Sequence, residues 1–179
     1  MAAGLHHDLL ETSWGWVGVV GSPAGIRYCS LPELTPIGAL EHLADLMNEP
    51  LPERRSGAFE EFRAQLDAYF RGELDSWDVR LDLEGASPFF RRAWEACRTI
   101  PPGETRSYRW LAEQAGNAKA ARGAGQAMAR NRVPLVVPCH RVIGSDGALH
   151  GFGGGGLPLK ARLLELEEGA RQALDAHRA

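Results

Sequence analysis

Both the charge and the residue pattern of the chain change near Gly85, and this change constrains the fold more than any other feature. Residues 1–84 contain 6 Lys and Arg against 15 Asp and Glu, a net charge of −9. Residues 85–163 contain 12 against 4, a net charge of +8, and the last 16 residues add −2. A chain of 179 residues can bury two small cores. We therefore expect two domains, residues 1–84 and 85–179. Either the basic domain meets a polyanion such as DNA, or the two domains simply attract each other.

Hydropathy and cysteine spacing limit the class of protein. No stretch approaches the roughly 20 apolar residues of a membrane span, and no signal-like segment starts the chain. We therefore expect a soluble, cytoplasmic protein with no membrane partner. Three widely spaced cysteines without a CxxC pair argue against a disulfide framework or a zinc cluster. Four residues could bind a metal in principle, but their irregular spacing favours scattered polar residues: His6, His7, Cys29 and His42.

Residues 1–84 predict a small α/β domain with an antiparallel sheet. Two short strands are expected between Trp14 and Leu31, around a glycine-bearing turn at 21–25. Helices should follow at about 35–48 and 57–71, and alternation predicts another strand at 79–83. This domain shows no catalytic constellation.

Residues 85–179 predict a mainly helical domain. Ser87 can cap a helix with Pro88 in its first turn, and Cys97 lies on the apolar stripe of that helix, as a core residue would. Two short helices should follow, from Ser107 to about 116 and from about 118 to 131, around a tight turn. This pattern matches a helix-turn-helix, although many all-α domains contain it.

The second of these short helices has one nearly bare side. Four residues share the side that should be buried: Ala120, Ala124, Ala127 and Met128. The other side carries Arg122, Gly125, Gln126 and Ala129. So little side chain allows a close approach to another surface. That surface could be a narrow DNA groove, which Arg122 would enter, or another helix.

Cys139 ends a buried, strand-like run between prolines, where a lone cysteine is most often a small core residue. His140 would point to the opposite face of an extended chain, yet through a water or a local turn it could draw off the thiol proton. Glu167 lies four residues after Leu163, at the edge of the apolar stripe of the last helix, predicted over 159–168. A carboxylate there needs a partner, so the three polar residues form a candidate Cys–His–acid set.

Two segments carry a resemblance to a known family. IPPGETRSYRWLAEQAGNAKAARGAGQAMARN and VPLVVPCHRVIGSDGALHGFGGGGLPLKARLLELE resemble the O6-alkylguanine-DNA alkyltransferases, also called methylated-DNA–protein-cysteine methyltransferases. The resemblance is strong over about residues 85–168 and loose before them. It implies a ribonuclease H-like α/β domain followed by a winged-helix-like domain with the helix-turn-helix. It also implies direct-reversal repair, in which alkyl groups move from O6-alkylguanine, and from O4-alkylthymine, to a cysteine after base flipping.

The resemblance also implies residue roles. Cys139 would be the single-use alkyl acceptor, His140 and Glu167 its activating pair, and Asn131 the link between the recognition helix and the active-site loop. Arg122 would enter from the minor groove and fill the gap that the flipped base leaves in the stack. Tyr108 would push on the DNA phosphate backbone and hydrogen-bond the flipped base. Further DNA contacts are expected from Gly125, Gln126, Ala129 and Arg130. The pocket would be lined by Tyr108, Met128, Pro134, Val142, Phe152, Gly153 and Gly154, with the Val142 carbonyl and a glycine N–H reading the guanine edge.

Partners and departures complete the expectations. The partner would be double-stranded DNA with alkylated bases, bound by a monomer, with clustering on DNA left open and no cofactor or metal. Arg132 stands where the family usually has Pro, and the glycine run after Phe152 is one residue longer. We hypothesise that this rim admits adducts larger than methyl. The alternatives are a non-enzymatic lesion-binding relative, a helix-turn-helix regulator and a Cys–His hydrolase. The presence of Cys139 argues against the lesion-binding relative. The bare Arg122 face has little with which to read bases, which argues against the regulator, and the hydrolase would leave the basic charge of residues 85–163 unexplained.

Overall fold

The structure is a computed structural model, described here over residues 4–153 and 155–178. It divides into two compact units. The first contains the residues up to Glu84 together with Arg132–Pro134, and the second contains Gly85–Asn131 and the residues from Leu135 onward. Residues 132–134, which the sequence placed in the second domain, therefore belong to the first unit. The chain crosses from one unit to the other three times.

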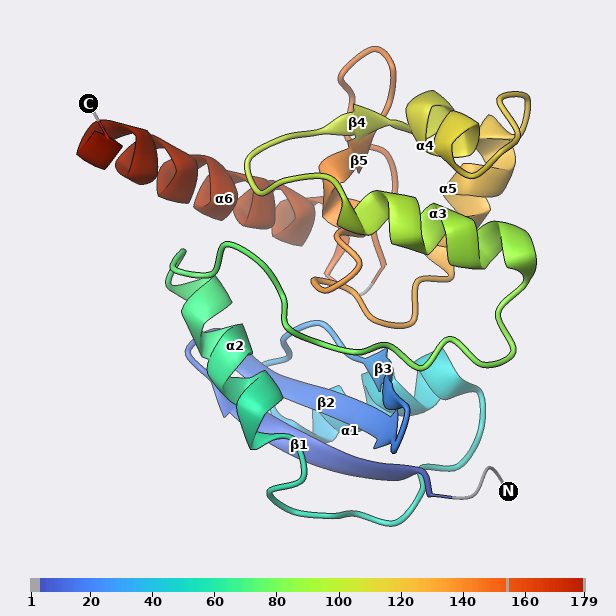
Figure 1. Ribbon diagram of the computed structural model, residues 1–179. Coiled ribbons are helices and arrows are strands. Elements are labelled where there is room, and N and C mark those ends of the chain that lie inside the picture. The colour runs from blue at the N-terminus through green and yellow to red at the C-terminus, as the bar shows by residue number, and fades with distance from the viewer. Residues whose placement is uncertain (1–3, 154, 179) are drawn as a thin grey trace. The chain divides into compact units, whose positions relative to one another are not determined.

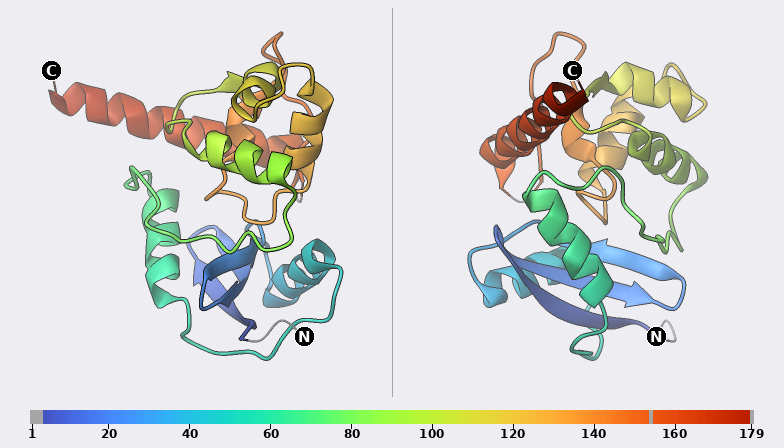
Figure 2. Two further views of the ribbon diagram at one scale, coloured as in Figure 1. Left: turned by 45° about the vertical axis from the view of Figure 1, so that its right-hand side comes forward. Right: turned by 60° about the vertical axis from the view of Figure 1, so that its left-hand side comes forward.

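The first unit is built on an antiparallel sheet of three strands in the order β1-β2-β3 (Figure 1). Its elements are β1 (His6–Thr12), β2 (Gly15–Ser22), β3 (Gly25–Cys29), α1 (Pro36–Met47) and α2 (Glu60–Phe70). Helices α1 and α2 lie on opposite faces of the sheet (Figure 2). The central strand is accordingly buried from Val17 to Gly21, as expected for a strand covered on both sides. Gly18 permits this packing, because a Cβ there would lie 2.9 Å from the Ala39 carbonyl oxygen.

Residues 132–134 are held at the edge of this sheet. The Cys29 N–H donates to the Arg132 carbonyl at 2.8 Å, beside β3. The Arg132 guanidinium lies 5.5 Å from the centre of the Tyr28 ring and donates to the Glu84 carbonyl at 3.0 Å. The segment that follows Asn131 in the chain is thus bonded into the first unit by both its backbone and a long side chain.

The sequence was wrong about two strands of this unit. It missed β1, because the His-His-Asp start of that strand hides the alternation of its apolar residues. It also predicted a strand at 79–83, where the structure has only one isolated bridge, between Ile26 and Leu81. Asp82 explains the short pairing: its carboxylate accepts from Ser22, Arg27 and the Glu84 N–H. Side-chain bonds of this kind compete with a strand ladder.

The second unit is mainly helical, as predicted. Its elements are α3 (Pro88–Arg98), β4 (Arg106–Ser107), α4 (Tyr108–Gln114), α5 (Ala121–Ala129), a 3₁₀ turn η1 (Cys139–Arg141), β5 (Val142–Ile143) and α6 (Gly156–Arg178). Both predicted caps are present: the Ser87 hydroxyl accepts from the Phe90 N–H, and the Ser107 hydroxyl from the Trp110 N–H. The apolar side of α5 is buried, and the Trp94 indole of α3 donates to the Ala127 carbonyl at 2.8 Å.

Three features of this unit differ from the sequence-based expectation. The buried run before Cys139 forms no strand, because Pro134 and Pro138 lack the N–H that a ladder needs and Leu135 turns the chain with a φ of 74°. The short parallel pair β4–β5 was missed, since two residues per strand show no periodicity. Helix α6 runs about ten residues beyond its predicted end.

Residues considered as metal ligands have other partners or are buried. His7 Nδ1 lies 2.7 Å from the Pro52 carbonyl oxygen, His42 pairs with Glu33 at 2.9 Å, and Cys29 is buried. Over the described ranges, we find no group of three or more His, Cys, Asp or Glu side chains able to hold a metal ion. Nor does any helix there combine the length and apolar character needed to cross a bilayer.

Candidate active site

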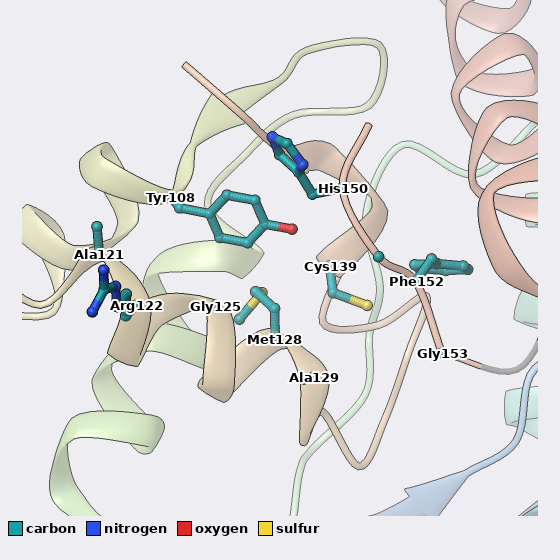
Figure 3. Close-up of a pocket in the computed structure, with 11 residues that line it drawn as sticks. Tyr108, Ala121, Arg122, Gly125, Met128, Ala129, Cys139, His150, Phe152 and Gly153 are labelled. Atoms are coloured by element: carbon teal, nitrogen blue, oxygen red, sulfur yellow. The ribbon is translucent and has the colours of Figure 1, made fainter. Parts of the chain in front are cut away.

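The second unit contains a pocket of about 660 Å³ that opens beside Cys139 (Figure 3). Helices α4 and α5 form one side of it, and the segment His150–Gly153 forms another. Figure 3 shows Cys139 between α5 and this segment. The lining residues are Tyr108, Ala121, Arg122, Gly125, Met128, Ala129, Cys139, His150, Gly151, Phe152 and Gly153.

Cys139 begins the 3₁₀ turn η1 and is 8% exposed. The turn forms because the Arg141 N–H donates to the Pro138 carbonyl at 2.9 Å, directly after the run that the prolines keep out of a sheet. Burial raises the pKa of the Cys139 thiol. The Asn131 side chain, the Lys160 ammonium and the N–H groups of Cys139 and His140 oppose that rise. The sulfur is therefore a neutral thiol at rest, in surroundings that favour a thiolate once the proton leaves.

His140, the next residue in the chain, is fully buried, with its Nε2 2.6 Å from Glu167 Oε1. Burial lowers the pKa of His140, against the attraction of Glu167. Burial alone would raise the pKa of the Glu167 carboxyl, but His140 and Arg141 hold it well below its usual range. A neutral imidazole beside a carboxylate carries its proton on Nε2, so Nδ1 is the nitrogen that can accept one. The predicted pairing of His140 with Glu167 is present.

Asn131 lies at the end of α5 and is buried. Its N–H donates to the Met128 carbonyl, and its side-chain Nδ2 donates to the Val137 carbonyl at 2.8 Å. The side chain also hydrogen-bonds the Cys139 sulfur. Asn131 thus joins the helix end to the loop that carries the cysteine. The loop is strained where Leu135 adopts a left-handed backbone, which costs a non-glycine residue about 1–3 kcal/mol.

Two buried cations at the site were missed by sequence reasoning. Arg141 donates to both Glu167 oxygens, at 3.0 and 2.8 Å, and to the Ile100 carbonyl at 2.5 Å. Lys160 is fully buried, and its Nζ donates to the carbonyls of Val142 at 2.8 Å and His150 at 3.1 Å. Burial lowers the pKa of Lys160, partly offset by Cys139. One signal was available: Lys160 lies three residues before Leu163 and seven before Glu167, on the same buried side of the helix.

The outer side of α5 is as bare as its sequence predicted. Arg122, Gln126, Ala129 and Arg130 are exposed. Arg122 reaches the edge of the pocket, whereas the Arg130 guanidinium lies 6.0 Å from the centre of the Phe90 ring. A Cβ at Gly125 would lie 4.0 Å from the Tyr108 ring, an ordinary van der Waals distance, so Gly125 faces Tyr108 with room for a small side chain.

The structure brings together most, but not all, of the expected pocket residues. Tyr108, Met128, Phe152 and Gly153 line the pocket, and burial raises the pKa of the Tyr108 hydroxyl. Pro134 does not line it and belongs to the first unit. The Val142 side chain is buried outside the lining, and its carbonyl accepts from Lys160. Gly154 lies outside the described residues. His150 lines the pocket and was not anticipated.

This arrangement can perform a nucleophilic substitution. A thiol lines a pocket, the next residue in the chain carries a neutral imidazole, and an ionised carboxylate fixed by Arg141 stabilises that imidazole once it accepts a proton. The carboxylate also holds the imidazole ring in place, so that its proton-accepting nitrogen, Nδ1, has a fixed orientation. The site thus has a nucleophile, a base and an orienting acid, contributed by η1 and α6.

Comparison with known proteins identifies the family of the chain. Residues 88–169 match the family model of the 6-O-methylguanine DNA methyltransferase DNA-binding domain. The methylated-DNA–protein-cysteine methyltransferase of Mycobacterium leprae is 55% identical over 118 residues, which cover 66% of this chain and 69% of that protein. The one from Mycolicibacterium paratuberculosis is 47% identical, covering 83% and 89%. The crystal structure of Mycobacterium tuberculosis OGT in complex with DNA is 39% identical, with a TM-score of 0.77 over 92% of this chain and 94% of that one. The chain therefore belongs to the methylated-DNA–protein-cysteine methyltransferase family.

Proposed function

We propose that this protein repairs alkylated DNA directly, by moving the alkyl group from O6 of a flipped-out guanine to the sulfur of Cys139. The observation that carries the proposal is the position of Cys139 on the wall of the pocket, next in the chain to His140, whose ring is bonded to Glu167 at 2.6 Å. Family membership supports it, since relatives that cover most of the chain are methylated-DNA–protein-cysteine methyltransferases.

The chemistry balances without a cofactor. The thiol proton passes through a water to His140 Nδ1, and Glu167 stabilises the imidazolium. The thiolate attacks the alkyl carbon, the bond from that carbon to O6 breaks, and its electron pair stays with the base. Guanine regains its amide form by taking up a proton at N1. The alkyl group remains on Cys139 as a thioether, so each molecule acts once.

Binding to duplex DNA would use the helix pair α4 and α5 as a helix-turn-helix. The short turn between Gln114 and Ala121 and the +8 charge of residues 85–163 support this role. The bare outer side of α5 fits a minor groove, where Arg122 would fill the gap left by the flipped base. Tyr108, across the pocket, would contact that base. We propose that a monomer binds in this way in the cytoplasm and that O4-alkylthymine is also accepted.

The experiment is a single-turnover labelling assay. The protein is incubated with duplex DNA carrying O6-methylguanine, and its peptides are examined by mass spectrometry. We expect one methyl group per molecule on the Cys139 peptide, lost in Cys139→Ala. The matched control is Cys97→Ala, since Cys97 is buried in the core of α3 and does not line the pocket. Repeated turnover without labelling, or binding without transfer, would refute the proposal.

A further inference from the structure

One wall of the pocket, the segment His150–Gly153, carries a single ionisable side chain. His150 lines the pocket together with Tyr108 and Cys139, and its ring centre lies 6.5 Å from that of Tyr108 with the planes at 50° (Figure 3). The other members of the segment are Phe152 and two glycines. His150 is therefore the residue that gives this wall its chemistry.

The position of His150 is fixed from two sides. Its carbonyl accepts from the buried Lys160 ammonium at 3.1 Å, and the same ammonium donates to the Val142 carbonyl. Its ring lies directly against the backbone of Gly144, where a Cβ would be 2.5 Å from His150 Nε2. Although the side chain is 58% exposed, its backbone carbonyl is bonded to Lys160 and the Nε2–Cδ2 edge of its ring lies against Gly144.

Charges around the pocket favour an anion. No residue that lines it is acidic, and Arg122 lies at its edge. Lys160 adds a positive charge directly beneath the His150 carbonyl. The carboxylate of Asp146 is 3.7 Å from His150 Nε2, but Asp146 is 71% exposed and does not line the pocket. Among the lining residues, a negative group inside the pocket would thus meet an imidazole and one cation, Arg122, and no acid.

We propose that His150 makes this pocket selective for O6 adducts whose alkyl group ends in a carboxylate. The proposal rests on the proposed function, because it concerns which adducts reach Cys139. An imidazole can donate a hydrogen bond and can take up a proton, and hydrogen bonds between charged groups are the stronger kind. Uncharged adducts of the same size would gain no comparable bond at this wall.

The transfer itself follows the same balance as for a methyl group. The Cys139 sulfur attacks the methylene carbon of a carboxymethyl adduct, and the bond from that carbon to O6 breaks. The electron pair stays with guanine, which takes up a proton at N1. This uptake balances the proton that the thiol gave up. The products are guanine and S-carboxymethylcysteine, with the carboxylate unchanged.

The test compares two adducts that differ in charge but hardly in size, O6-carboxymethylguanine and O6-(carbamoylmethyl)guanine. Equal amounts of the two duplexes compete for the intact protein, with O6-methylguanine duplex in the same mixture, and the labels on the Cys139 peptide are counted. We expect the wild-type protein to prefer the carboxylate by about fivefold, the size of a partly exposed charged hydrogen bond. His150→Phe keeps a ring at the wall and should bring the ratio to about one. Ser145→Ala, an exposed change on the same loop, should keep the wild-type ratio.

The outcomes separate the two proposals. If O6-methylguanine labels Cys139 but the wild-type protein shows no preference, or His150→Phe keeps it, the role of His150 is refuted and the repair function stands. If no duplex labels Cys139, the repair function itself fails. His150→Gln is a second variant, in case His150→Phe disturbs the pocket wall. Glutamine keeps a hydrogen-bond donor but cannot take up a proton, so its carboxylate preference should fall between those of the wild-type protein and His150→Phe. A wild-type ratio in His150→Gln would also overturn the assignment of the preference to the imidazole.

Discussion

Replacing Arg141 tests whether the buried ion pair with Glu167 holds the site together. The Arg141 side chain is 5% exposed and that of Glu167 2%. In Arg141→Met the volume is nearly kept, so little cavity forms, but the carboxylate loses the cation that bonds both of its oxygens. Removing one partner of a buried pair costs about 3–5 kcal/mol. For a chain of this size, that corresponds to a fall in Tm of about 6–20 °C.

The assay is thermal and denaturant unfolding followed by circular dichroism, with an exposed arginine as the matched control. Arg109 pairs with Glu113 at 3.3 Å, but its side chain is 77% exposed, so Arg109→Met should cost less than about 1 kcal/mol. A double variant with Glu167→Gln should recover part of the loss, because it removes the uncompensated charge. If Arg141→Met costs no more than Arg109→Met, the buried pair does not stabilise the site and the reasoning is wrong.

The same pair has a defined dependence on pH. The folded pKa of Glu167 lies below its ordinary value, so its stabilisation is complete above about pH 4.3 and is lost as the pH falls toward the folded pKa. The stability difference between the wild-type protein and Arg141→Met should therefore shrink in acid. If the difference in stability between the two proteins is unchanged down to about pH 3, the assigned charge of Glu167 is contradicted.

Three further predictions concern the reaction. Arg122→Ala should slow repair of duplex DNA by about tenfold or more, yet leave the reaction with free O6-benzylguanine much less affected, because a free base needs no flipping. Equal losses would mean that Arg122 has another role. Lys160→Met releases the Val142 and His150 carbonyls, so single-turnover transfer should slow by about tenfold through misplacement of the pocket wall. A wild-type rate would refute this role. Burial lowers the pKa of His140, so the imidazole remains unprotonated and able to act as a base at its ordinary pKa of about 6.5. The transfer rate should therefore stay level as the pH falls to about 6.5 and decrease only below that value. A rate already halved at neutral pH would contradict that.

The sequence predicted the helices of this protein well, because their signals are local. Ser87 and Ser107 cap their helices as expected, and the buried side of α5 follows the 3.6-residue period. It was less reliable where pairing depends on distant residues. The strand expected at 79–83 is reduced to one bridge by the bonds of Asp82, and the apolar run before Cys139 turns at Leu135 instead of pairing.

The sequence predicted the pairing of His140 with Glu167 and the link from Asn131 to the loop before Cys139, but not the two buried cations of the site. Glu167 could be placed from its distance to Leu163, since both lie on one helix. The spacing of Lys160 to Leu163 indicates a buried position, but neither Lys160 nor Arg141 could be given its partners, because a cation in an apolar stretch gives no sign of the carbonyls or carboxylate that will surround it. Their partners come from other elements: Ile100 follows α3, and the His150 carbonyl lies in the glycine-rich loop.

The attachment of residues 132–134 to the first unit means that the two halves of this protein are not interchangeable modules. A cut at Gly85 would not release an intact second unit, because Arg132–Pro134, between α5 and Cys139, belong to the first unit. Arg132 contacts Cys29 and Tyr28 at the edge of the sheet. A hybrid that grafts another N-terminal half onto this C-terminal half would have to supply a matching edge for Arg132–Pro134. Residues 1–84 thus provide the sheet edge that holds Arg132 in place, seven residues before Cys139.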